Sequence, residues 1–287
     1  MSTMKDFKAE KPTWCPGCGD FGVLNAMQRA AVSLGLEPEN VAVISGIGCS
    51  GKMSQHFGGY GLHSLHGRSL PTAQAVKLAN KNLTVMAAGG DGDGFGIGMG
   101  HFIHAMRRNV DITYIVMDNH IYGLTTGQAS PTSDIGSTTK TSPHGTVEKP
   151  IEPLQLALSE RCGFIAQGFS GDTKHLASLI EKAIRHRGFS FVNVFSPCVT
   201  FNKVNTYEFY KTGLVNLDED EGYNNADRFE AMRRVSEANN LVVGVVYEDP
   251  AQTSYEDTVY GYPAESLVSM ERGLKQEEYD RILAAFH

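Results

Sequence analysis

The 287-residue sequence has no apolar run that approaches the roughly 20 residues needed to cross a membrane. Its first residues also lack the apolar core of a signal peptide. There is no basic block, and 25 Lys and Arg stand against 32 Asp and Glu, for a net charge of −7. An acidic chain of this kind argues against nucleic acid as a partner. We therefore expect a soluble, cytoplasmic protein that binds neither membranes nor nucleic acid.

Proline and cysteine are both sparse. The 11 prolines are too few for a collagen-like chain, although glycine reaches 31 residues. The glycines gather in residues 86–100, where they predict backbone that approaches a ligand closely. The five cysteines predict metal or redox chemistry, because a disulfide framework is rare in an intracellular chain.

Short β-branched runs alternate with longer amphipathic stretches through the first 200 residues. Nearly continuous apolar runs are typical of strands that are covered on both faces, and strand–helix alternation predicts an α/β fold with a parallel sheet. Ligands bind such sheets at the carboxyl ends of the strands. The expected strands are 41–44, 83–88, 112–117 and 189–195. The expected helices are 20–34, 70–80, 97–108, 151–161 and 173–186.

The composition changes near residue 200, which divides the chain into a main domain, 1–200, and a C-terminal extension, 201–287. Residues 123–150 are rich in Gly, Ser, Thr and Pro and predict a long loop. The extension contains an acidic cluster, a helical stretch near 226–239 and a tyrosine-rich segment. We expect it to lie against the main domain.

A glycine-rich turn that contains Asp91 and Asp93 follows the expected strand 83–88. Glycines at a strand-to-helix turn let backbone amides bind phosphate. A dinucleotide site with Asp118 as its ribose ligand fits poorly, because the glycine spacing is wrong and acidic side chains repel phosphate. A cation removes this repulsion, and Asp91 and Asn119 offer oxygen ligands for Mg²⁺ at neighbouring strand ends. The plain alternative is a turn with capping aspartates and no ligand.

Four of the cysteines fall at positions that can converge. Cys15 and Cys18 form a Cys-x-x-Cys loop, while Cys49 and Cys198 each follow an expected strand. Four thiolates can hold either Zn²⁺ or a [4Fe–4S] cluster, and the cysteines alone do not decide between them. Cys162 follows a helix and is expected to be a buried thiol.

Taken together, these motifs resemble the β subunits of 2-oxoacid:ferredoxin oxidoreductases, most nearly the two-subunit type, which often acts on 2-oxoglutarate. The resemblance is strong over about residues 1–210 and weak over 211–287, and it implies a thiamine diphosphate-binding domain of the pyrophosphate type. The motifs are Trp14-Cys-Pro-Gly-Cys-Gly-Asp20, Gly46-Ile-Gly-Cys-Ser-Gly51, Leu65-His-Gly-Arg68, Gly90-Asp-Gly-Asp-Gly94, Met117-Asp-Asn119, Tyr122-Gly-Leu124 and Ser196-Pro-Cys198.

The resemblance also implies site residues. A [4Fe–4S] cluster would lie on Cys15, Cys18, Cys49 and Cys198. Mg²⁺ would be bound by Asp91, Asn119 and the backbone carbonyl of Ile121. Thiamine diphosphate contacts map to Ile47, Gly48, Cys49, Ser50, His66, Gly92, Asp93, Gly123 and Leu124. No catalytic residue is assigned to this chain, although Lys52 is a candidate contact for a substrate carboxylate, with a solvated loop lysine as the alternative.

The implied reaction is the coenzyme A-dependent oxidative decarboxylation of a 2-oxoacid, with 2-oxoglutarate favoured and pyruvate possible. Electrons would leave through the cluster to ferredoxin. The motifs cover only the diphosphate half of a thiamine site, so an α subunit should supply the other half and form a heterodimer. Two alternatives stay open: a non-redox thiamine diphosphate decarboxylase or synthase, and a zinc-stabilised nucleotide-binding module.

Overall fold

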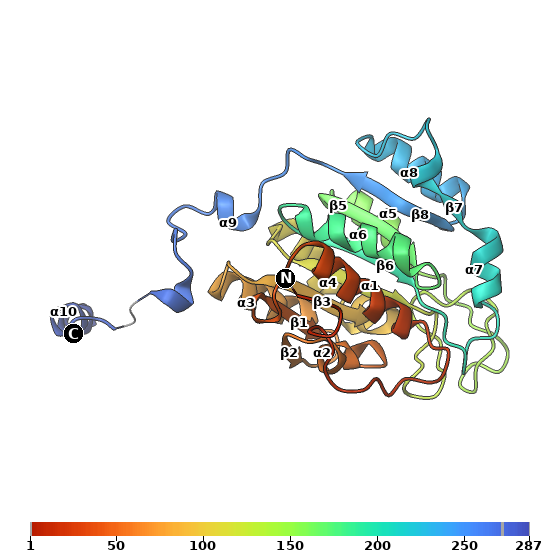
Figure 1. The fold of residues 1–287 in the computed structure, drawn as a ribbon, viewed down its shortest axis with the longest axis horizontal. Helices are drawn as coiled ribbons and strands as arrows, with labels where there is room; N and C mark the ends of the chain where they lie inside the picture. The colour runs from red at the N-terminus through yellow and green to blue at the C-terminus, as the bar shows by residue number, and fades with distance from the viewer. Residues whose placement is uncertain (1, 271–272, 287) are drawn as a thin grey trace.

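An eight-stranded sheet forms the centre of the molecule in the computed structural model, which describes residues 2–270 and 273–286 (Figure 1). The strand order is β2-β1-β3-β4-β6-β5-β8-β7. Six strands run parallel, β8 pairs antiparallel with β5, and β7 pairs parallel with β8. The strands are β1 (Val41–Ser45), β2 (Tyr60–His63), β3 (Thr84–Gly90), β4 (Thr113–Asp118), β5 (Phe164–Phe169), β6 (Ser190–Phe195), β7 (Val215–Asn216) and β8 (Val242–Glu248).

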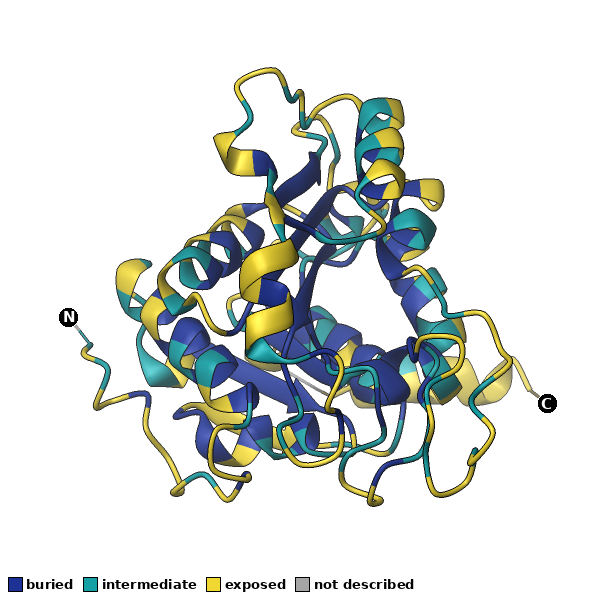
Figure 2. Cartoon of the chain, turned by 90° about the vertical axis from the view of Figure 1, so that its right-hand side faces the viewer, coloured by how far each residue is buried: buried dark blue, intermediate teal, exposed yellow. Residues whose placement is uncertain are grey.

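Helices cover both faces of this sheet, and each face has its own apolar core. One core joins the sheet to α1 (Asp20–Ser33) and α6 (Thr173–Arg185). The other joins it to α3 (Ser69–Ala79), α4 (Met99–Arg108), α5 (Pro153–Ser159) and α8 (Arg228–Glu237). The central strands are therefore buried along their length between two layers, as Figure 2 shows. The remaining α-helices are α2 (Met53–His56), α7 (Tyr207–Gly213), α9 (Tyr255–Thr258) and α10 (Gln276–Ala284).

The four predicted strands and the five predicted helices are confirmed, with ends that shift by at most two residues. Residues 123–150 contain no helix or strand, as expected of a loop. The prediction missed β5, because Gln167 and Gly168 interrupt its apolar pattern. It also missed β2, which is exposed along its length and lacks the apolar signal of the central strands.

The C-terminal extension has two structural parts. Its first part completes the sheet, because β8 pairs with β5 directly. Its second part begins with α9, which is bound to the body through the Asp257–Arg187 ion pair at 2.8 Å, and then runs away from the body to α10 (Figure 1). Two further hydrogen bonds fix this second part to the end of α3. The Tyr262 hydroxyl donates to the Leu78 carbonyl oxygen at 2.7 Å, and Ser266 Oγ donates to Asn80 Oδ1 at 3.1 Å.

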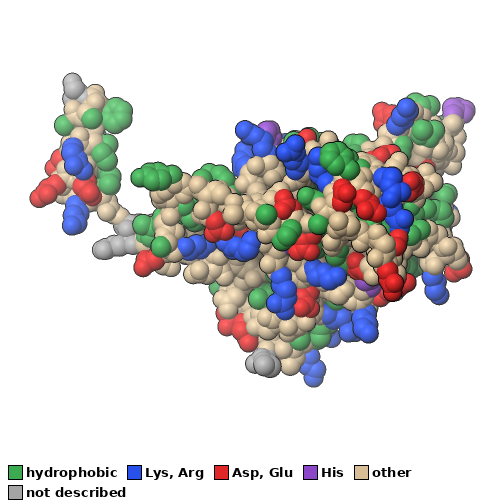
Figure 3. All heavy atoms as spheres, turned by 90° about the horizontal axis from the view of Figure 1, so that it is seen from above, with side chains coloured by type: hydrophobic (Ala, Val, Ile, Leu, Met, Phe, Trp, Pro, Cys, Tyr) green, Lys and Arg blue, Asp and Glu red, His purple; other side chains and the backbone are tan. Residues whose placement is uncertain are grey.

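On the face drawn in Figure 3, basic and acidic side chains are interspersed rather than gathered by sign. In the described parts of the chain, residues 2–270 and 273–286, no helix is both long and apolar enough to span a membrane.

Candidate active site

A cavity of about 650 Å³ lies where β1, β3 and β4 end. Parallel pairing sets Ser45 beside Ala88 and Gly90 beside Met117, so these strands present their carboxyl ends at one edge. Every residue predicted to bind thiamine diphosphate or Mg²⁺ lines this cavity: Ile47, Gly48, Cys49, Ser50, His66, Asp91, Gly92, Asp93, Asn119, Ile121, Gly123 and Leu124. Strand ends alone pointed to Asp91 and Asn119, and the family resemblance pointed to the others; the structure brings them together at one cavity, and their binding roles stay predictions.

Asp93 organises two loops of the cavity wall. Its Oδ1 accepts hydrogen bonds from the backbone N–H of Ile47 at 2.9 Å and of Gly67 at 2.8 Å. Burial raises the pKa of this carboxyl, although these hydrogen bonds oppose the effect. A Cβ on Gly46 would lie 1.9 Å from Asp93 Oδ2, so only glycine allows the loop to approach so closely. Asp93 therefore anchors the loop after β1, and a direct contact with the cofactor stays a prediction.

His66 is oriented by the same carboxylate. Its Nδ1 lies 2.9 Å from Asp93 Oδ1, and its side chain is 40% exposed at the cavity wall. His66 lines the cavity, and this contact leaves its other ring nitrogen, Nε2, available to a further partner. When it carries a proton, it can donate to an anion such as a phosphate oxygen.

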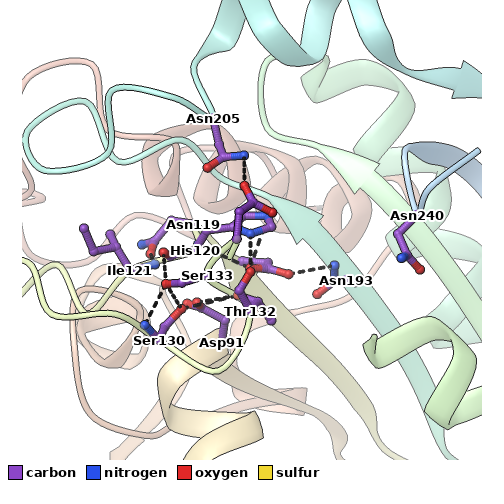
Figure 4. A network of polar contacts seen from close by, with 12 residues as sticks. Asp91, Asn119, His120, Ile121, Ser130, Thr132, Ser133, Asn193, Asn205 and Asn240 are labelled. Atoms are coloured by element: carbon purple, nitrogen blue, oxygen red, sulfur yellow. Dashed lines mark hydrogen bonds and ion pairs between the residues drawn. The ribbon is translucent and has the colours of Figure 1, made fainter. Parts of the chain in front are cut away.

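Two buried carboxyls face one hydroxyl beneath the cavity, in the network drawn in Figure 4. Thr132 Oγ1 lies 2.8 Å from both Asp91 Oδ2 and Asp118 Oδ1. Burial and then the Asp118 charge raise the pKa of Asp91 to about 7. A hydroxyl has one proton and can satisfy only one carboxylate. The pair therefore needs a further proton or a cation. Although burial opposes it, the charges of Asp118 and Asp91 raise the pKa of His120, whose Nε2 lies 3.8 Å from Asp118 Oδ1, so His120 can supply one positive charge. A metal ion bound at Asp91 is the second way to neutralise the pair.

The chain turns sharply where β4 ends. Asn119 Oδ1 accepts a hydrogen bond from Ile121 N–H at 3.1 Å, and His120 takes a left-handed φ of 58°. This turn brings Asn119 and Ile121 to the cavity that Asp91 also lines. One carboxylate, one amide oxygen and one backbone carbonyl are hard ligands that fit Mg²⁺ when diphosphate oxygens complete its sphere.

Three of the predicted cluster ligands influence one another beside the cavity. A Cβ built on Gly123 would lie 3.5 Å from Cys198 Sγ and 3.8 Å from Cys49 Sγ, so both thiols face the same small space. Burial, followed by the nearby Asp20 and Cys198, raises the pKa of Cys49 to about 12. Burial, Asp20, Cys49 and Cys198 likewise raise the pKa of Cys18. The exposed Cys15 acts weakly on Cys49.

These thiols share a neighbourhood without forming a closed metal-binding group. Within residues 2–270 and 273–286, no three or more His, Cys, Asp or Glu side chains are gathered closely enough to hold a metal ion. The predicted Mg²⁺ site contains only one such side chain, Asp91. Partly buried thiols with raised pKa values, such as Cys18 and Cys49, are nevertheless ligands that bound iron would stabilise as thiolates.

Cys162 lies apart from this group. It is 1% exposed, and its Sγ contacts the carbonyl oxygen of Phe164 at 3.3 Å. The expectation of a buried thiol is confirmed.

Lys52 does not line the cavity. Its ammonium group donates to Thr13 Oγ1 at 3.1 Å. It nevertheless lies close enough to lower the pKa of Cys49, against the larger effects of burial and Asp20.

Sequence reasoning assigned no role to three residues that lie in the cavity wall or directly behind it. Tyr122 donates from its hydroxyl to the Gly92 carbonyl oxygen at 3.0 Å and closes one wall. Thr132 lies in the long loop and carried no sequence signal. Asp20 lines the cavity next to the Cys-x-x-Cys loop, and its position in that motif is the signal that could have revealed it.

Comparisons with known proteins agree with this geometry. Residues 39–194 match the family model "Thiamine pyrophosphate enzyme, C-terminal TPP binding domain", and residues 198–264 match the model of the C-terminal part of the pyruvate ferredoxin oxidoreductase beta chain. The chain is 42% identical over 269 residues to the 2-oxoacid:ferredoxin oxidoreductase subunit beta of Saccharolobus solfataricus, covering 89% of this chain and 88% of that relative. The chain belongs to the family of 2-oxoacid:ferredoxin oxidoreductase beta subunits.

Other members of this beta-subunit family are similar to the chain. The 2-oxoglutarate oxidoreductase subunit KorB of Mycobacterium tuberculosis is 42% identical over 199 residues, which cover 69% of this chain and 53% of that relative. A solved 2-oxoglutarate:ferredoxin oxidoreductase from Magnetococcus marinus superposes with a TM-score of 0.86 at 43% identity, over 89% of this chain and 88% of that one. The predicted family, the thiamine-binding α/β fold and the identification as part of an enzyme are confirmed.

Proposed function

We propose that this beta subunit binds thiamine diphosphate, Mg²⁺ and a [4Fe–4S] cluster, and works with an α subunit. The assembled enzyme would convert 2-oxoglutarate and coenzyme A to succinyl-CoA and CO₂ and pass the electrons to ferredoxin. One observation carries this proposal most directly. Gly123 and Cys49 line the predicted cofactor cavity, and a Cβ built on Gly123 would lie 3.5 Å from Cys198 Sγ and 3.8 Å from Cys49 Sγ. The predicted electron acceptor and the predicted cofactor thus share one wall.

When bound, thiamine diphosphate supplies the electron sink that decarboxylation needs. In this proposal, the residues of the chain bind and orient it. Asp91, Asn119 and the Ile121 carbonyl hold the metal, while the backbone from Ile47 to Ser50 and the His66 ring hold the diphosphate. Asp93 keeps both loops in position through its backbone hydrogen bonds. Residues 1–200 would thus bind the cofactors, while residues 201–287 complete the sheet and form the C-terminal extension.

Support for 2-oxoglutarate comes from the relatives. The Magnetococcus marinus structure is described with 2-oxoglutarate, coenzyme A and succinyl-CoA bound, and several related subunits are named for 2-oxoglutarate. Pyruvate is the second candidate, because the C-terminal family model is named for pyruvate ferredoxin oxidoreductase. Family membership sets aside the non-redox thiamine enzyme and the zinc-stabilised module.

The test is a substrate comparison on the assembled α and β chains, prepared without oxygen. We expect kcat/KM for coenzyme A-dependent ferredoxin reduction to be at least about tenfold higher with 2-oxoglutarate than with pyruvate, a difference of about 1.4 kcal/mol. A preference for pyruvate would refute the substrate assignment. Fewer than four irons per αβ unit in fully active enzyme would refute the cluster assignment.

A further inference from the structure

The turn that follows β4 is held by side chains from two other segments. The carbonyl oxygen of Asn119 accepts a hydrogen bond from Asn202 Nδ2 at 3.0 Å. The carbonyl oxygen of His120 accepts one from Ser133 Oγ at 2.6 Å (Figure 4). In the part of the chain that the structure describes, no hydrogen bond reaches the carbonyl oxygen of Ile121. The carbonyl that is predicted to bind Mg²⁺ is therefore the one of these three that is free to bind a ligand.

This turn needs outside support because its backbone conformation is an uncommon one. His120 has a left-handed φ of 58°, which a residue other than glycine keeps only where its surroundings hold it. The long loop provides part of this support, through Ser133 and through the Thr132 carbonyl oxygen, which lies 2.6 Å from His120 Nδ1. Asn202 provides support from a different part of the chain, the C-terminal extension that begins at residue 201.

The side-chain amide of Asn202 forms hydrogen bonds at both of its ends. Its Oδ1 accepts from the backbone N–H of Val204 at 2.9 Å and of Asn205 at 3.0 Å. These two donors fix which end of the amide is oxygen, so Nδ2 is the end that donates to Asn119 and, at 2.8 Å, to Asn205 Oδ1. A turn of this kind needs only the acceptor oxygen, which Asp or Ser also provides. The two donated bonds are therefore what an amide adds at this position.

Asn202 is also bound to the segment of a predicted cluster ligand. Its backbone N–H donates to the Cys198 carbonyl oxygen at 3.1 Å. Asn205 extends the connection, because its Nδ2 donates to Asp134 Oδ2 in the long loop at 3.2 Å. Both asparagines are buried, so water competes little for these hydrogen bonds. One buried amide thus joins the segment of Cys198 to the turn that carries Asn119.

We propose that Asn202 is a positioning residue for the predicted Mg²⁺ site, because it holds the turn that carries Asn119 and the Ile121 carbonyl. This inference rests on the proposed function, since it requires Mg²⁺ on this turn. Side chains that orient metal ligands from behind typically change metal affinity by about 10- to 100-fold when they are removed. Asn202 does not line the cavity and acts through Asn119. The C-terminal extension thereby takes part in cofactor binding.

The experiment measures the binding of Mn²⁺, a paramagnetic substitute for Mg²⁺, to the assembled αβ enzyme at saturating thiamine diphosphate. Free Mn²⁺ is followed by electron paramagnetic resonance, without oxygen and without a 2-oxoacid. Asn202→Asp keeps the acceptor oxygen and loses the donor, and Asn202→Ser keeps a shorter acceptor without adding a charge. We expect the Kd for Mn²⁺ to rise about tenfold in both variants, which corresponds to about 1.4 kcal/mol. Iron content should stay unchanged, because the backbone bond to Cys198 is kept.

Asn109→Asp is the matched control. Asn109 also joins the body to the C-terminal extension, since its Nδ2 donates to the Thr253 carbonyl oxygen at 2.8 Å. Its Oδ1 accepts from the Phe189 backbone N–H at 2.8 Å. Asn109 and Phe189 precede β4 and β6, at the end of the sheet opposite the cavity. We therefore expect this variant to lose comparable hydrogen bonds and to keep the wild-type Kd for Mn²⁺.

Wild-type Mn²⁺ affinity in either Asn202 variant would overturn the inference and leave the proposed function intact. An equal loss of affinity in Asn109→Asp would also overturn it, since general stability would then explain the effect. Loss of iron together with Mn²⁺ affinity in the Asn202 variants would overturn it as well, because Asn202 would then serve the folding of the whole segment. Wild-type enzyme that binds thiamine diphosphate equally well without a divalent ion would overturn the proposed function, and this inference with it.

Discussion

Single residues at strand ends carry most of the chemistry of this cavity. Asp91 and Asn119 could be predicted because a polar residue that directly follows a buried strand is placed at the ligand edge. The hydrogen bond from the Gly67 backbone N–H to the Asp93 side chain could not be predicted, because it depends on where the Gly67 backbone lies in three dimensions. Thr132 belongs to a loop without periodicity, and only its distances to the two carboxyls reveal it.

Asp91→Ala tests the metal site at this scale. Removing the charged ligand should lower the Mg²⁺-dependent affinity for thiamine diphosphate by at least about tenfold, or 1.4 kcal/mol, in calorimetric titration of the αβ enzyme. Asp227→Asn is the control, because it neutralises an exposed carboxylate and preserves the cap of α8. Unchanged affinity in Asp91→Ala would remove Asp91 from the metal site.

The cysteines provide a second test of single residues. Cys198→Ser should lose iron and visible absorbance, because one of four thiolate ligands is gone. Cys162→Ser should keep both, since this thiol is buried against the Phe164 backbone, apart from the other four. Equal loss of iron from the two variants would contradict the ligand assignment.

Whole elements are tied to the site by buried amides that cross the sheet. Asn193 Nδ2 on β6 donates to Gln167 Oε1 on β5 at 2.8 Å and to Asp118 Oδ2 at 3.3 Å. Gln167 Nε2 in turn donates to the carbonyl oxygens of Asn240 and Val242, which lead into β8. The residue that made β5 unrecognisable in the sequence is thus the one that joins β8 to the site. Central apolar strands such as β4 could be predicted because burial on both faces leaves a local pattern.

Gln167→Leu tests this connection between elements. It leaves two carbonyls and the Asn193 amide without their partner, and each buried polar group left unpaired costs about 1–3 kcal/mol. We expect a lower urea midpoint for the αβ enzyme at matched protein concentration. Gln276→Ala on the exposed α10 should change stability by less than about 0.5 kcal/mol. Equal urea midpoints for wild type and Gln167→Leu would show that the hydrogen bonds of the Gln167 amide do not stabilise the enzyme.

The whole molecule presents its cofactor cavity at an edge of the sheet with exposed apolar side chains around it. Ile47 and Leu124 line the cavity and remain exposed, and Leu65 and Ile97 flank it in the adjoining segments. Apolar side chains gathered at a cavity mouth are typical of a surface that a partner covers. The family name of a beta subunit agrees with that reading. An α subunit placed there would enclose the cofactor between the chains.

The isolated beta chain should therefore show no 2-oxoacid-dependent reduction of ferredoxin or viologen, and adding the α chain should restore it. The control is the mixture without thiamine diphosphate, which should stay inactive. Full turnover by the beta chain alone, with its purity established by mass spectrometry, would contradict the need for a partner.

The most direct test of the central claim is one anaerobic optical measurement on the αβ enzyme loaded with thiamine diphosphate and Mg²⁺. The claim is that the cofactor cavity and the four-cysteine cluster form one electron path. We predict that adding 2-oxoglutarate and coenzyme A, without ferredoxin, bleaches the visible iron–sulfur absorbance, and that adding oxidised ferredoxin restores it. An enzyme that forms succinyl-CoA while the iron–sulfur absorbance stays unchanged would contradict the account.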